Sequence, residues 1–182
     1  MPRPLLPGHG LELLHTADLS PVMLDALHEL MESSFDDWTD DDTDHTFGGL
    51  HAMIWDGGVP AAHGALVQRS LLLGDDPYRA GYVEGLAVHP NRRGQGLGAA
   101  VMQALEQVAD RAYPLTALST SEEARGFYET RGWVRWRGPT YVLSPTGPER
   151  TPRDDGGVYV RTSMPVDVVA RIACDWRAGD VW

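Results

Sequence analysis

The feature that most constrains the fold is a glycine-rich run, Arg93-Gly94-Gln95-Gly96-Leu97-Gly98. It follows an apolar stretch, 82–88, that is typical of a strand, and it precedes apolar residues that recur at helical spacing over 96–112. Glycines let consecutive backbone N–H groups turn toward one point, and a helix start carries partial positive charge. The run therefore predicts an anion site at a strand-to-helix turn, or a tight turn without a ligand.

Three expected strands precede this run, at 50–55, 59–73 and 78–88. Short turn signals at 56–58 and 74–77 join them, which indicates an antiparallel meander. A dinucleotide-binding fold is disfavoured, because no parallel strand-helix-strand unit begins the chain and the glycine spacing is not G-x-G-x-x-G.

The remaining elements follow from periodicity, capping signals and chain breakers. They are a strand at 11–14, a helix starting at 18–21, a loop or short helix at 35–45, a strand at 115–118, a helix at 121–131, strands at 133–136 and 158–161, a loop-like stretch at 138–157 and a candidate short helix at 165–176. Ser119 with Glu122, and Thr120 with Glu123, form overlapping capping boxes, and Gly132 is expected to end that helix. We expect one α/β or α+β domain over 1–182, with a loop-rich C-terminal extension from about 138.

Composition excludes several functions. The 26 Asp and Glu outnumber the 15 Lys and Arg, which argues against nucleic-acid binding and favours either a cationic ligand or simple solubility. One cysteine, Cys174, permits no internal disulfide. The stretch 1–7 is too short and too proline-broken for a signal peptide, and no apolar run is long enough to span a bilayer, so we expect a cytoplasmic protein without a membrane partner.

A metal site is not expected, because the histidines form no H-E-x-x-H and there is no C-x-x-C. His51 and His63 are better interpreted as hydrogen-bonded residues of the sheet than as metal ligands. Trp133 and Trp136 are expected in the core or an interface, and Cys174 is expected to serve packing.

Two segments resemble the signatures of the GCN5-related N-acetyltransferases. Residues 86–98 are similar to the acyl-CoA signature Arg/Gln-x-x-Gly-x-Gly/Ala, which Arg93, Gly96 and Gly98 match. Residues 124–133 resemble the second signature, in which a helix tyrosine precedes a Gly-aromatic strand start. The resemblance implies a mixed, mostly antiparallel sheet flanked by helices, with splayed central strands, and acetyl-CoA as the acyl donor.

Over nearly its whole length the chain resembles the aminoglycoside 2′-N-acetyltransferases of mycobacteria and related bacteria. The segments that carry this likeness are 45–52, 81–85, 138–140, 144–148 and 174–182. It implies direct attack of an aminoglycoside 2′-amine on acetyl-CoA, a role in antibiotic resistance, and a homodimer. Two alternatives stay open: the same chemistry on a cell-wall amino sugar or polyamine, or a non-catalytic acyl-CoA-binding module.

Two residues are the candidates for proton transfer. Glu84 shares a face with Leu86 and Val88 in an ideal strand, where its carboxylate accepts the amine proton directly or through water, binds the cationic amine, or simply faces solvent. Tyr128 is either the acid that protonates the leaving thiolate or a core partner of Phe127.

The remaining site residues come from the resemblance. Coenzyme A is expected at Leu86, Ala87, Val88, Arg93, Gly94, Gln95, Gly96, Leu97 and Gly98. The polycationic acceptor is expected at Asp37, Asp42, Glu84, Gly85, Ser119, Asp154, Asp180 and Trp182. If the natural chain also ends at Trp182, its terminal carboxylate adds an acid. Asp155 stands beside Asp154, so that assignment can shift by one residue.

Overall fold

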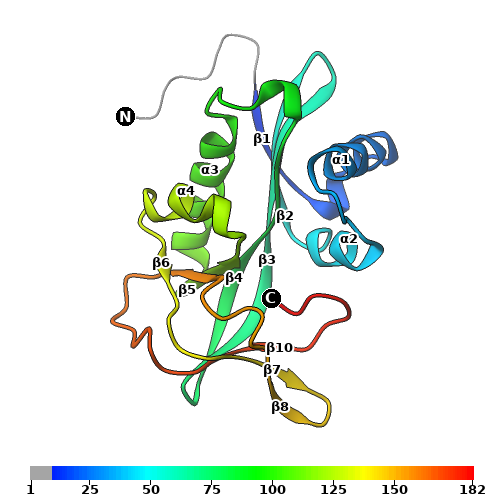
Figure 1. Ribbon diagram of the computed structural model, residues 1–182. Helices are drawn as coiled ribbons and strands as arrows, with labels where there is room; N and C mark the ends of the chain where they lie inside the picture. The colour runs from blue at the N-terminus through cyan, green and yellow to red at the C-terminus, as the bar shows by residue number, and fades with distance from the viewer. Residues whose placement is uncertain (1–9) are drawn as a thin grey trace. The chain divides into compact units, whose positions relative to one another are not determined.

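The structure is a computed structural model that describes residues 10–182, so the N-terminal stretch judged above as a signal-peptide candidate lies outside it (Figure 1). The chain forms two compact units. Unit 1 comprises residues up to Val67 together with Val83–Val108, and unit 2 comprises Gln68–Tyr82 together with Ala109–Trp182. Two long strands, β3 (Val59–Leu73) and β4 (Asp76–Val88), contribute residues to both units.

The sheet of unit 1 contains β1 (Leu11–His15), β2 (Leu50–Asp56) and the first part of β3, all antiparallel. β2 and β3 form the predicted hairpin, because Gly57 and Gly58 adopt the positive φ angles that such a tight turn needs. The burial of successive residues in β2 and β3 shows that both faces of this sheet are covered.

Helices cover this sheet. The helix start predicted at 18–21 is confirmed: α1 spans Pro21–Ser34, and Ser20 caps it by accepting a hydrogen bond from Met23 N–H. The helix buries Leu27 against Met53 of β2. The Asp-rich patch contains α2 (Asp40–Thr46), which resolves the choice between loop and helix. The other helical segments here are η1 (Thr16–Asp18), η2 (Pro90–Arg92) and α3 (Leu97–Ala112).

Unit 2 has a mixed sheet with the strand order β6-β9-β5-β4-β3-β10-β7-β8. Its remaining strands are β5 (Leu115–Ser119), β6 (Val134–Arg135), β7 (Thr140–Ser144), β8 (Gly147–Arg150), β9 (Val158–Arg161) and β10 (Ile172–Asp175). The pairs β4–β5 and β7–β10 are parallel, whereas β5–β9, β6–β9, β7–β8 and β3–β10 are antiparallel. The expected mixed, mostly antiparallel sheet is therefore present.

The predicted helix at 121–131 is shorter than expected. A 3-10 turn, η3 (Glu122–Ala124), precedes α4 (Arg125–Glu129), and Ser121 occupies the cap position without a side-chain cap bond. The two predicted capping boxes are wrong, because Ser119 is still paired with Val158 at the end of β5 and the cap position is Ser121, not Thr120. Gly132 ends the segment with a φ of +83°, as predicted.

The predictions of a loop-like stretch and a short helix in the C-terminal region are wrong. Residues 138–157 contain the hairpin of β7 and β8, drawn in yellow to orange in Figure 1, and 165–176 contains β10 instead of a helix. β10 buries Ile172, Ala173 and Cys174 while pairing with both β3 and β7. A short apolar run buried on both faces has no periodicity, so the pattern could not separate strand from helix. Within residues 10–182, no helix is long and apolar enough to cross a membrane.

Candidate functional site

The middle of β4 departs from an ideal strand at Gly85, whose φ is +53°. A Cβ atom at this position would lie 2.9 Å from Cγ2 of Thr46, so glycine is required both for the backbone angle and for space. Glu84, immediately before it, is half-buried. The expectation that Glu84 shares a face with Leu86 and Val88 assumed an ideal strand, and the kink at Gly85 removes that assumption.

After the kink, the strand alternates between two packed faces. Leu86 and Val88 both point toward α3, since their side chains come within 3.3 and 3.2 Å of where Cβ atoms on Gly64 and Gly98 would lie. Ala87 packs on the opposite side, in a cluster with Leu30 and Met31 of α1. The side chains of residues 86–88 are thus committed to packing, which leaves their backbone groups as the part that can meet a ligand.

The glycine-rich loop is built as an anion site requires. Gly94 and Gly96 have φ angles of +76° and +81°, and nothing lies within 4 Å of a Cβ placed on either residue. Leu97 is buried and anchors the start of α3, whereas residues 93–96 are exposed. Arg93 Nε donates to the Val88 carbonyl at 3.4 Å, and Arg92 pairs with Asp56. An open loop at the N-terminus of a helix, with an arginine beside it, fits a diphosphate.

Two predicted acceptor-binding acids lie near the start of α2, Asp37 in the preceding turn and Asp42 in the helix. Asp37 is exposed, and Asp42 Oδ2 accepts hydrogen bonds from Thr39 N–H at 2.9 Å and Thr39 Oγ1 at 2.7 Å. This reciprocal capping box begins α2 and holds the Asp42 carboxylate in place. Sequence reasoning missed this second role, although the spacing Thr39-x-x-Asp42 is a capping signal.

In unit 2, Tyr128 points inward. It is 7% exposed, its ring lies 5.1 Å from that of Phe127 and 6.1 Å from that of Trp133, and Phe127 is half-buried. Burial raises the pKa of Tyr128 to about 12, although a hydrogen bond with the Thr120 side chain opposes the shift. Of these two adjacent residues, the structure buries Tyr128 and leaves Phe127 half-buried, and the Tyr128 proton is firmly held.

The neighbouring acids Asp154 and Asp155 have opposite environments. Burial raises the pKa of Asp154, and the nearby Asp180 carboxylate raises it further. Hydrogen bonds from Arg150 lower the pKa of Asp155 well below its usual range. Asp155 is thus engaged by Arg150, whereas the Asp154 carboxylate lies close to a second acid.

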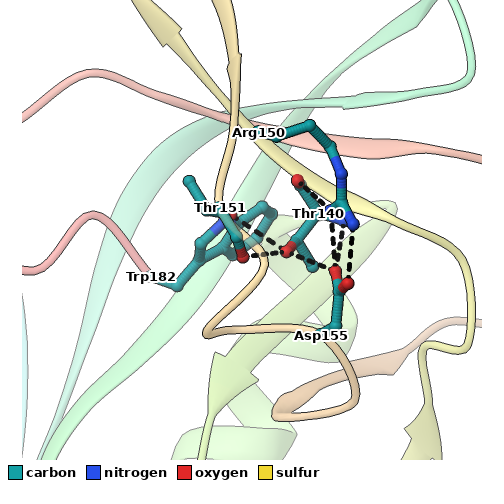
Figure 2. Close-up of polar contacts among 5 residues, drawn as sticks. All are labelled: Thr140, Arg150, Thr151, Asp155 and Trp182. Carbon is teal, nitrogen blue, oxygen red and sulfur yellow. Dashed lines mark hydrogen bonds and ion pairs between the residues drawn. The ribbon is translucent and has the colours of Figure 1, made fainter.

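A hydroxyl chain holds the C-terminal tryptophan (Figure 2). The indole Nε1–H of Trp182 donates to Thr151 Oγ1 at 3.0 Å, and Thr151 Oγ1 donates to Thr140 Oγ1 at 2.9 Å. Thr140 also contacts Asp155 Oδ1, at 2.9 Å from both its backbone nitrogen and its hydroxyl. Arg150 completes the network with bonds of 2.8 and 2.7 Å to the two Asp155 oxygens, so Trp182, only 6% exposed, is fixed.

The segment before Trp182 is held as well. Arg177 Nε donates to the Asp180 carbonyl at 2.8 Å, and the Cys174 thiol donates to the Val181 carbonyl at 3.2 Å. Cys174 is buried, as expected for a packing residue. Ser119 is half-buried at the end of β5, and the next residue, Thr120, donates its N–H to the Gly157 carbonyl at 3.0 Å.

The structure thus gathers the predicted residues into two groups. Unit 1 holds Glu84 to Val88, the loop 93–98, Asp37 and Asp42, and unit 2 holds Ser119, Tyr128, Asp154, Asp180 and Trp182. No cluster of three His, Cys, Asp or Glu suited to a metal ion occurs among residues 10–182. His51 and His63 are buried and hydrogen-bonded, as predicted, but the chain of contacts they form was not foreseen.

Comparison with known proteins agrees with this arrangement. Residues 14–133 match the model of the acetyltransferase (GNAT) family. An aminoglycoside 2′-N-acetyltransferase from Mycolicibacterium fortuitum is 48% identical over 180 residues, which cover 96% of this chain and 92% of that protein. The chain therefore belongs to the acetyltransferase (GNAT) family.

Solved structures share the fold. An acyl-CoA N-acyltransferase from Pseudomonas aeruginosa superposes with a TM-score of 0.61 at 20% identity, covering 85% of this chain and 99% of that one. A GNAT family acetyltransferase from Brucella melitensis, solved in complex with acetyl-CoA, gives a TM-score of 0.59 at 13% identity over 93% of this chain and 97% of that one.

Proposed function

We propose that this chain transfers the acetyl group of acetyl-CoA to the 2′-amine of aminoglycosides. The observation that carries the proposal is the 48% identity with an enzyme of that name over 96% of the chain. The acidic residues Asp154 and Asp180 support it, because two carboxylates held close together disfavour each other's charge and favour a polycationic ligand.

The glycine loop is the proposed site of the coenzyme A diphosphate. The backbone N–H groups of residues 94–98, at the start of α3, would bind its oxygens together with the Arg93 guanidinium. The backbone of Leu86, Ala87 and Val88 would hold the pantetheine arm in the manner of an added strand. One N–H near Leu86 would polarise the thioester carbonyl.

Acetyl-CoA supplies an activated thioester, and the protein supplies the proton transfers. Glu84 accepts the proton that the attacking amine loses, directly or through a water molecule, as the new C–N bond forms. Tyr128 gives its phenolic proton to the sulfur as the C–S bond breaks. Its pKa, raised to about 12 by burial, keeps Tyr128 protonated at neutral pH, which any acid role requires.

The acceptor is proposed to lie among Asp37, Asp42, Glu84, Gly85, Ser119, Asp154, Asp180 and Trp182. We further propose that the protein is a cytoplasmic homodimer of a single acetyltransferase domain, 1–182, that confers aminoglycoside resistance. Its single, buried cysteine is consistent with a reducing compartment. Light scattering of the purified protein tests the dimer.

The test of the reaction is thiol release from acetyl-CoA with two aminoglycosides that differ at one position, a 2′-amine and a 2′-hydroxyl. The proposal expects turnover of the first and none of the second. Equal turnover of both would contradict the regiochemistry. A cell-wall amino sugar or a polyamine with a much higher kcat/KM would reassign the acceptor, and no thiol release with any amine would indicate a binding module.

A further inference from the structure

A continuous hydrogen-bonded chain crosses the core of unit 1 and ends at the kink in β4. Thr16 Oγ1 lies 2.7 Å from His51 Nε2, His51 Nδ1 lies 2.8 Å from His63 Nε2, and His63 Nδ1 lies 2.8 Å from the Gly85 carbonyl oxygen. Both histidines are fully buried. The proton-transfer roles proposed above use neither of them.

The last acceptor determines the direction of every bond in this chain. A carbonyl oxygen cannot donate, so His63 must carry its proton on Nδ1 and accept at Nε2. His51 must then donate from Nδ1 to His63 and accept at Nε2 from the Thr16 hydroxyl. Thr16 Oγ1 accepts from Gly49 N–H at 3.2 Å. It also lies 3.2 Å from the Gly49 carbonyl oxygen, but its one proton is directed to His51, whose Nε2 is 2.7 Å away and has no proton in this arrangement.

The two rings are held in these neutral forms. Burial lowers the pKa of His63 to about 3 and that of His51 to about 4, so neither carries charge near neutral pH. Phe47 stacks near both rings, with centroid distances of 5.0 Å to His51 and 6.3 Å to His63. In the sheet, His51 pairs with Ala65 and His63 with Met53, so the two histidines are diagonal neighbours across β2 and β3.

The acceptor of this chain is an unusual backbone position. Among residues 10–182, the other glycines with positive φ lie in turns, loops or the first residue of a strand, whereas Gly85 lies inside one. Gly85 lies between Glu84 and Leu86. A rotation of its carbonyl group therefore changes the course of the backbone on both sides. A side-chain donor that fixes this carbonyl therefore fixes the local course of β4.

We propose that His63, oriented by His51 and Thr16, is a positioning residue: it holds the Gly85 carbonyl and thereby sets the placement of Glu84 and of the backbone of residues 86–88 for acetyl transfer. The inference rests on the proposed function, because it assigns the kink to the same site. It assigns His63, His51 and Thr16 a role in the reaction, although none of them would contact either substrate.

The experiment uses a matched pair, His63→Leu and His63→Asn. The two side chains have nearly the same shape, but the Asn Nδ2 stands where the His Nδ1 does and can donate to Gly85. We expect His63→Leu to lower kcat about 10- to 100-fold with the KM for acetyl-CoA changed less than about threefold, and His63→Asn to recover most of kcat. Equal kcat in the two variants, per mole of folded enzyme, would overturn the inference.

Two NMR measurements keep the inference testable independently of activity. In the wild-type protein labelled with ¹⁵N-histidine, both rings should be protonated at Nδ1, and a proton on Nε2 of His63 would overturn the chain. In His63→Leu, the backbone amide signals of residues 84–88 should shift from their wild-type positions, whereas in His63→Asn they should return toward them. A wild-type protein that acetylates no amine, but shows these signals, refutes the proposed reaction and leaves the hydrogen-bonded chain standing.

Discussion

The two compact units hold their central polar groups by opposite means. In unit 1, the chain through His51 and His63 is neutral, fully buried and built between strands. In unit 2, the network around Asp155 and Arg150 is charged, and both of these side chains are 39% exposed (Figure 2). The first network depends on the position of single protons, whereas the second depends on full charges that persist over a wide pH range.

The difference matches what each unit is proposed to do. The histidine chain ends on a backbone carbonyl beside Glu84, where a second fixed charge would compete with proton transfer from the amine. The charged network ends on Thr151 and Trp182, close in sequence to acids that are expected to bind a polycation. The neutral network aligns backbone, and the charged network reaches the C-terminal Trp182 through the hydroxyl of Thr151.

Lowering the pH should produce the largest difference between the contributions of the two networks to stability. Because the folded pKa values of His51 and His63 are about 4 and about 3, the unfolded chain binds protons below pH 6.5 and the folded chain does not. Their contribution is therefore complete above pH 6.5 and is lost as pH falls. From pH 7 to pH 5 we expect the free energy of unfolding to drop by about 4 kcal/mol, because each histidine contributes about 1.4 kcal/mol per pH unit below pH 6.5.

The Asp155 network should be untouched over that interval. The pKa of Asp155 is lowered by Arg150, so its contribution is present above pH 3.8 and is lost only below that value. Denaturant unfolding at pH 7, 6 and 5 measures the change. His63→Asn should lose about half of the pH dependence, and an equal slope in wild type and variant would show that the buried pair is not its source.

Tyr128→Phe tests whether the inward tyrosine of unit 2 acts in chemistry or only in packing. The substitution keeps the ring contacts with Phe127 and Trp133 and removes the proton proposed for the thiolate. We expect kcat to fall about 100-fold with little change in thermal stability. Thiol release at saturating substrate measures the effect, and a wild-type rate would mean that water protonates the sulfur.

Much of the fold could be predicted because local signals agreed with it. Three local signals each favour one conformation, and all three are present: the glycine run, the Gly57-Gly58 hairpin and the Ser20-Pro21 helix start. The C-terminal region failed for a physical reason. β10 is a strand only because β3 and β7 supply partners on both sides, and that non-local pairing leaves no periodic trace in the sequence.

Two substitutions in unit 2 should have different effects: Asp155→Asn should lower stability, and Asp154→Asn should weaken aminoglycoside binding. Asp155→Asn loses the two-oxygen bond to Arg150, so we expect a loss of about 1–2 kcal/mol in the free energy of unfolding. Asp154→Asn should cost no stability, because burial and Asp180 already disfavour its charge, yet it should raise the KM of the aminoglycoside about fivefold. The same response in both variants would contradict the separate roles.

The site was predictable in type more than in arrangement. Glu84, Tyr128 and the glycine loop could be named from motif resemblance, yet the kink at Gly85 and the inward orientation of Tyr128 depend on packing. The histidine chain could not be foreseen, since His51 and His63 are twelve residues apart and meet only through the β2–β3 register. The sequence motifs specify chemistry, whereas these contacts specify position.

The smallest effects are expected from substitutions in the hydroxyl chain of unit 2, which test whether Thr151 and Trp182 act through one shared hydrogen bond. Thr151→Val and Trp182→Phe each remove one partner of the same hydrogen bond, the 3.0 Å contact in Figure 2. We expect each to raise the KM of the aminoglycoside about two- to threefold with kcat unchanged, because the C-terminal segment loosens. The double variant should be no worse than the single ones, since the bond can be broken only once.

Thr146→Val is the matched control for this cycle. Thr146 is an exposed threonine whose hydroxyl bonds to Glu149 in the β7–β8 turn, apart from the chain that reaches Trp182. It should leave the KM of the aminoglycoside unchanged. If the KM effects of Thr151→Val and Trp182→Phe multiply in the double variant, the two side chains act separately, and the C-terminal segment is then held by Arg177 and Cys174 instead.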